Sequence, residues 1–132
     1  MAVTHSTTAR DAATNAVVDL LDGAGSKLVF RISPSSVVSP GTAAATLTFA
    51  TPAFGASSSG TATRTASITS DTNATGNASP VAYATLETSA GTVHIHCAVA
   101  ASASDINLTN GLTINAGDTV SCSSLEYTAL AA

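Results

Sequence analysis

Residues 85–99 constrain the fold more than any other stretch, because they read as two β-strands joined by a short Ser-Ala-Gly turn. In the second strand, apolar residues alternate with polar or small ones, and the apolar set is Val93, Ile95, Cys97 and Val99. A period of two is typical of a strand with one face on a core. We therefore expect a central hairpin in an antiparallel sheet, with His94 and His96 together on its outer face.

One helical pattern lies in residues 8–22, and Gly23 follows it as a stop signal. The apolar face predicted for this helix consists of Ala13, Ala16, Val17, Leu20 and Leu21. Such a narrow aliphatic face is typical of a helix that covers one end of a sheet or packs on a neighbouring subunit.

Short strands separated by turn signals fill the rest of the chain. Alternation predicts strands at 26–32, 46–50, 61–68 and 120–127. The last one changes phase, which a bulge near Ser123 and Ser124 would repair. The pattern indicates a mainly β fold, an antiparallel β-sandwich with one N-terminal α-helix. We expect a single domain, built from an arm and helix (1–25) and a β-sandwich (26–132).

Composition excludes several classes of partner. Only 9% of the residues are charged, four are basic, and the net charge is −4, so the positive surface that binds phosphate backbones is missing. No stretch approaches the roughly 20 apolar residues of a membrane span, and no signal peptide opens the chain. We expect a protein made in the cytoplasm that binds neither nucleic acid directly nor a membrane.

The strongest candidate for chemistry is the pair His94 and His96, since alternate residues of a strand point the same way and two imidazoles can share a metal ion. A zinc site needs further ligands. The chain offers His5, Glu87, Glu126 or the same pair from a symmetry-related subunit, none at a diagnostic spacing. The favoured interpretation is a pair of partly exposed sheet or interface histidines, with no metal and no cofactor assigned.

Cys97 and Cys122 both fall in the core phase of predicted strands, where a free thiol behaves as a small apolar group. A disulfide between them would require neighbouring or facing strands, and a cytoplasmic origin argues against it.

Catalytic motifs are missing as well. The chain has no Gly-x-Ser-x-Gly elbow, phosphate loop or His-Glu-x-x-His, so we expect no enzyme and name no catalytic residues.

A series of short motifs resembles a family of small structural proteins of tailed bacteriophages and prophages, and it covers nearly the whole chain. The motifs include Lys-Leu-Val-Phe-Arg at 27–31, Phe-Ala-Thr-Pro-Ala-Phe-Gly-Ala at 49–56, Ala-Tyr-Ala-Thr-Leu at 82–86, Asp-Ile-Asn-Leu at 105–108 and Ile-Asn-Ala-Gly-Asp-Thr-Val-Ser at 114–121. The chain departs from the family pattern at residues 94–97, where members carry small or apolar residues followed by glycine. The resemblance therefore assigns no role to the histidines.

The resemblance implies a virion component. We expect a capsid decoration or cement protein that bridges capsomers, bound to the major capsid protein, to copies of itself, or to both, as a homo-oligomer with a trimer favoured. One alternative is a tail or neck subunit. Another is a metal- or carbohydrate-binding module in which Tyr83 joins His94 and His96.

Overall fold

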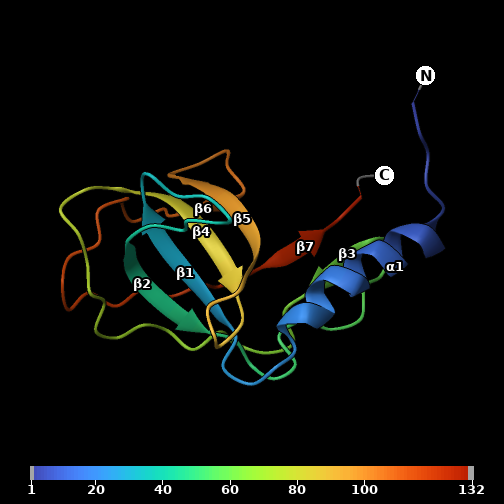
Figure 1. The fold of residues 1–132 in the computed structure, drawn as a ribbon, viewed down its shortest axis with the longest axis horizontal. Coiled ribbons are helices and arrows are strands. Elements are labelled where there is room, and N and C mark those ends of the chain that lie inside the picture. The colour runs from blue at the N-terminus through green and yellow to red at the C-terminus, as the bar shows by residue number, and fades with distance from the viewer. Residues whose placement is uncertain (1, 131–132) are drawn as a thin grey trace.

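The predicted hairpin is the centre of a five-stranded sheet in the computed structural model, which describes residues 2–130 (Figure 1). The sheet order is β2-β1-β4-β5-β6. Its strands are β1 (Lys27–Ile32), β2 (Ala43–Thr48), β4 (Val81–Glu87), β5 (Val93–Ala100) and β6 (Ile106–Asn107). All neighbours pair antiparallel except β5 and β6, which pair parallel. The mainly β fold with one N-terminal helix is thus confirmed.

One face of this sheet carries the core. Leu28 and Phe30 of β1 lie opposite Leu47 and Ala45 of β2 on one side and opposite Leu86 and Ala84 of β4 on the other. The layer that covers them is largely irregular, and its buried members are Phe49, Ala53, Phe54, Ile68, Ala74, Ile114 and Val120. The rings of Phe49 and Phe54 pack at a centroid distance of 5.6 Å. Most of the second layer is therefore turn-rich chain.

The strand predicted at 120–127 is wrong. Val120 makes only an isolated bridge to Asp71, and β7 (Glu126–Thr128) pairs with β3 (Thr61–Thr63) in a separate two-stranded sheet. The change of phase marks the place where the chain leaves the main body for this second sheet. It does not mark a bulge within one strand. The strand predicted at 61–68 is likewise shortened to β3.

The helical pattern at 8–22 forms α1 (Thr7–Val18) and a 3-10 turn, η1 (Asp19–Leu21). Ser6 caps α1, because its Oγ accepts a hydrogen bond from the Ala9 amide at 3.2 Å. The predicted apolar face is only partly confirmed, because Leu21 is buried, Ala13 and Val17 are half-buried, and Ala16 and Leu20 are exposed. The structure buries Thr14, Val18 and Leu21, whereas Leu20 is 52% exposed.

Polar hydrogen bonds explain this different face. Asp11 Oδ1 accepts from the Gly60 amide at 2.7 Å, and Asn15 Oδ1 accepts from the Ser57 amide at 2.8 Å. Thr14 Oγ1 donates to the Gly60 carbonyl at 2.6 Å. The helix therefore docks through a polar stripe at positions i, i+3 and i+4, which an analysis of apolar periodicity does not detect.

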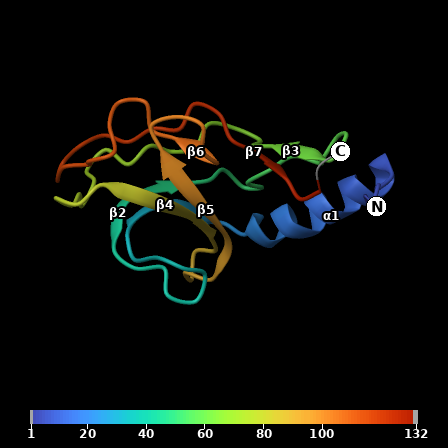
Figure 2. The ribbon, with the colours of Figure 1, turned by 90° about the horizontal axis from the view of Figure 1, so that it is seen from above.

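Helix α1 packs on β3 and β7, and these three elements form a lobe that we call the extension. Figures 1 and 2 show the extension projecting from one end of the main sheet. Residues far apart in sequence thus share the extension, which joins the helix of the expected N-terminal part (1–25) to two strands of the expected sandwich (26–132). In the described part of the chain, no helix is both long and apolar enough to cross a membrane.

Candidate functional site

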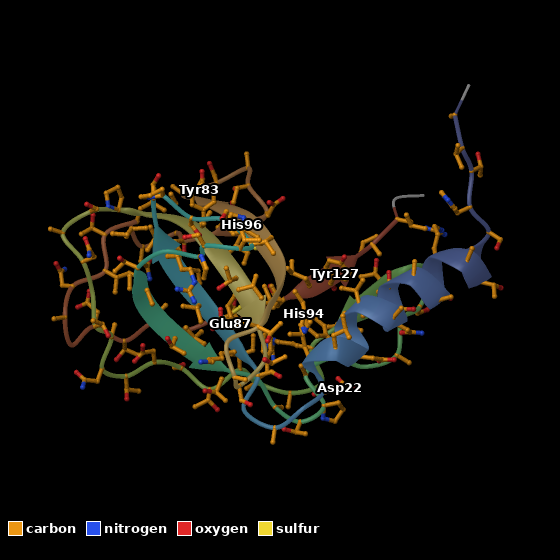
Figure 3. The ribbon with its side chains drawn as sticks, viewed as in Figure 1. Asp22, Tyr83, Glu87, His94, His96 and Tyr127 are labelled. Carbon is orange, nitrogen blue, oxygen red and sulfur yellow. The ribbon has the colours of Figure 1, made fainter. Side chains whose placement is uncertain are left out.

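The face of the sheet opposite the core carries His96, together with side chains from β1 and β4 (Figure 3). His96 pairs with Thr85, which pairs in turn with Val29. The loop between β1 and β2 (33–42) lies across this side, as Figure 2 shows. We call this surface the polar face. Both histidines are half-buried, in keeping with the partly exposed sheet histidines that the sequence predicts, and the loop covers part of the face around His96.

A register shift separates the two histidines. Leu86 pairs with Ile95 but Glu87 pairs with Val93, so His94 is the extra residue of a β-bulge. The bulge moves Val93 from the predicted core face to the face of Glu87. Strict alternation, on which the histidine pair was predicted, ends at Ile95 for this reason.

His96 connects the sheet to the covering loop. Its Nε2 lies 3.0 Å from Ser35 Oγ, and Ser35 Oγ itself donates to the Pro40 carbonyl at 2.7 Å. Because the single hydroxyl proton of Ser35 is used on Pro40, Nε2 of His96 must carry a proton and donate. The imidazole also packs on the Tyr83 ring at a centroid distance of 4.9 Å. These contacts hold the imidazole ring in place, where it donates a hydrogen bond to the covering loop.

A buried charge cluster lies beside it. Arg31 donates through Nε to Thr85 Oγ1 and through Nη2 to Glu87 Oε2, both at 2.9 Å, and through Nη1 to the Gly41 carbonyl at 2.8 Å. Thr85 Oγ1 donates to Glu87 Oε2 at 2.8 Å, and Lys27 Nζ lies 3.7 Å from Glu87 Oε1. Glu87 is therefore fully engaged. It neutralises Arg31 and does not stand free as a general base or a metal ligand.

The potential zinc ligands are not brought together. His5 lies in the exposed chain before α1, and Glu126 belongs to β7 in the extension. Among residues 2–130, no three side chains of His, Cys, Asp or Glu are grouped so that they could hold a metal ion.

Cys97 and Cys122 are free thiols, so the disulfide left open by the sequence is not formed. Burial raises the pKa of Cys97 to about 11, with a further contribution from the charge of Asp105. Burial also raises the pKa of Cys122, against the lowering effects of a hydrogen bond to Ser124 and of Arg64. Both thiols are protonated near neutral pH and make poor nucleophiles.

Two hollows lie on the core side, where the C-terminal segments do not fully close the sheet. One, of about 760 Å³, is lined by Phe30 and by residues between 105 and 126. The other, of about 430 Å³, we call the edge groove. It runs between β5 and β7, and its apolar lining is Leu86, Ile95, Cys97, Ile106, Leu125 and Tyr127.

Sequence reasoning thus found His96 but missed Arg31, Ser35 and the partners of Glu87. The sequence contains one indication of this cluster, because Lys27 and Arg31 alternate with Leu28 and Phe30 and so lie on the opposite face of β1.

Comparison with protein-family models, with curated proteins and with solved structures finds no match.

Proposed function

We propose that this chain is a non-enzymatic structural protein of a virion, a capsid decoration or cement protein that stabilises the head by bridging capsomers. The observation that carries the proposal is the extension. It holds α1, β3 and β7 away from the main sheet and leaves one side of the helix exposed, at Thr7, Thr8, Ala9, Ala12 and Ala16. A body with a projecting lobe suits a subunit that contacts more than one neighbour.

The polar face and the weak surface charge support the same role. Arg31 and Lys27, half of the four basic residues, interact with Glu87, so these charges are compensated within the chain itself. The best-formed polar cluster is saturated by its own hydrogen bonds, which suits a rigid scaffold better than a reactive centre. Small contacts per copy become effective when symmetry repeats them over a shell.

The test is to delete the gene from a phage or prophage that encodes the chain and to heat the purified particles. Particles that lack the protein should release their DNA at a lower temperature, and adding the purified protein back should restore the original temperature. Unchanged heat resistance would contradict a cement role. A stained gel of intact virions gives a second readout, because a copy number near that of the major capsid protein is expected, whereas a few to some dozens of copies would indicate a tail or neck subunit.

A further inference from the structure

The outer edge of β5 is open next to the edge groove. Among residues 2–130, the strand that covers this edge is β6, and it reaches only Val99 and Ala100. The Ala98 amide donates outward to Asp105 Oδ2 at 2.9 Å. Since backbone groups of alternate residues point to the same edge, the amide and carbonyl of His96 also point outward, where no strand of the described chain pairs with them.

The bulge at His94 limits how far a new strand could pair along this edge. Regular geometry extends from Ala98 to Ile95 and then ends. The edge therefore suits a segment of only a few residues. Bulges are a common device for preventing indiscriminate pairing of edge strands, so an open edge of this length would select a short partner.

The edge groove lies beside the same part of β5, because Ile95 and Cys97 belong to its lining. An extended segment on this edge would place every second side chain over apolar residues of the groove. Asp105 and Glu126 also line the groove and are exposed. The site therefore combines unpaired backbone groups, an apolar floor and carboxylates at its margin.

The chain itself carries a segment of matching chemistry. Residues 2–6, which we call the arm, precede α1 and are exposed throughout, and Val3 is 81% exposed. In an extended arm, Val3 and His5 point to the same side. The valine would then enter the groove while the imidazole N–H meets the acidic margin. The arm contains no acidic residue.

Geometry prevents the arm from reaching the β5 edge of its own chain. Figures 1 and 2 both place the start of α1 at the far end of the extension from β5. The 12-residue helix spans roughly 18 Å, and the five residues of a fully extended arm span about 17 Å. An arm that turned back would use its whole length before it reached the sheet.

We propose that the arm of one copy adds as a short strand to the β5 edge of a second copy, with Val3 in the edge groove. This inference deepens the proposed function, because it names the contact through which the subunits join each other. The contact is heterologous, with an arm on one side and an edge on the other, so a suitable rotation closes it into a ring such as a trimer.

Cysteine cross-linking tests the contact, because Cys97 already lines the groove. In a Cys122→Ser background, Val3→Cys should form a disulfide with Cys97 of another copy under mild oxidation by diamide. Trypsin cleaves after Arg10 and Arg64, so the product is peptide 1–10 linked to peptide 65–132. Thr4→Cys is the matched control, since an adjacent residue of a strand points away from the groove and should cross-link at least several-fold less.

Deletion of residues 2–5, which keeps Ser6 as the cap of α1, gives an independent readout by light scattering. The full chain should have a mass that is a multiple of 12.9 kDa, and the truncated chain should become monomeric. The proposal is overturned if Val3→Cys and Thr4→Cys cross-link equally or not at all, or if truncation leaves the mass unchanged. It is also overturned if truncation abolishes binding to capsids but not self-association. A protein missing from virions but positive in the cross-linking test would refute only the proposed function.

Discussion

Glu87 holds the polar face together. Its carboxylate is 2% exposed and accepts from both Arg31 and Thr85. A buried carboxylate that balances a buried guanidinium contributes little net stability compared with an apolar pair, but removal of one partner leaves the other charge without compensation. The cluster therefore contributes more to the specificity of the fold than to its stability. Single substitutions within it are expected to lower the free energy of unfolding strongly.

We expect Glu87→Ala to lower the free energy of unfolding by about 3–5 kcal/mol, because Arg31 then remains buried without a counter-charge. Urea denaturation measures this change. Lys27→Ala is the matched control, since the ammonium lies 3.7 Å from Glu87 and is 29% exposed. It should cost no more than about 1 kcal/mol. A double variant with Arg31→Met and Glu87→Leu should recover much of the loss, and a double variant as unstable as Glu87→Ala would contradict this account.

Cys97 gives stability a defined pH dependence. Its pKa is about 11 in the folded chain, against 9.0 for an unperturbed thiol. The unfolded chain therefore loses the thiol proton first. The stability that this difference provides is complete below pH 9.0 and is lost as the pH rises to about 11.

We therefore expect the free energy of unfolding to fall through this alkaline window and to fall less steeply in Cys97→Ala. The difference between the two slopes isolates the contribution of the Cys97 thiol, because the two proteins differ only at this residue. Denaturation curves at several pH values between about 8 and about 11 measure it. Parallel slopes would show that the thiol is not protected in the folded state.

Among the secondary-structure elements, α1 shows how a helix can dock through polar groups. Thr14 Oγ1 donates to the Gly60 carbonyl and accepts from the Ala129 amide at 3.1 Å. One buried hydroxyl thus ties the helix to the start of β3 and to the residues after β7. The extension depends on this contact because the helix offers little apolar surface of its own.

Thr14→Val should destabilise the protein by about 1–3 kcal/mol, because it leaves the buried Gly60 carbonyl and the half-buried Ala129 amide without partners. Hydrogen exchange at Ala129 should also accelerate, which reports on the extension specifically. Thr8→Val is the matched control, since Thr8 lies in the same helix but is exposed. Equal effects of the two substitutions would show that helix propensity, not the hydrogen bonds, sets the stability.

The same elements show what the sequence could predict. Alternation of large apolar residues correctly located β1 and the β4-β5 hairpin, since Leu28 and Phe30 have the side-chain period of a strand. It found β2 only in part, because the strand predicted at 46–50 lies at Ala43–Thr48. It failed for α1, where polar groups make the contacts, and at His94, where one extra residue reverses the facing. The link between Arg31 and Glu87 joins residues 56 positions apart and follows from strand order, which local patterns do not encode.

At the scale of the whole molecule, the C-terminal segments cover the core only incompletely. The side chains along the edge groove are therefore only half-buried. Ile95, Cys97, Ile106, Leu125 and Tyr127 all contact the core without being enclosed by it. Burial of this surface against another subunit would add to the stability of each chain. Folding and association should therefore be coupled.

We expect the thermal midpoint of the purified protein to rise with protein concentration, because an associated state that binds only folded chains is favoured by mass action. With 9% charged residues and apolar surface at the proposed contact, the midpoint should change little between about 0.05 and about 0.5 M NaCl, a range over which surface ion pairs are progressively screened. Differential scanning calorimetry over a dilution series measures both effects. A midpoint independent of concentration would show that the chain completes its stability alone. A midpoint that falls steeply with salt would show that the acidic margin at Asp105 and Glu126, and not the apolar floor, dominates the contact.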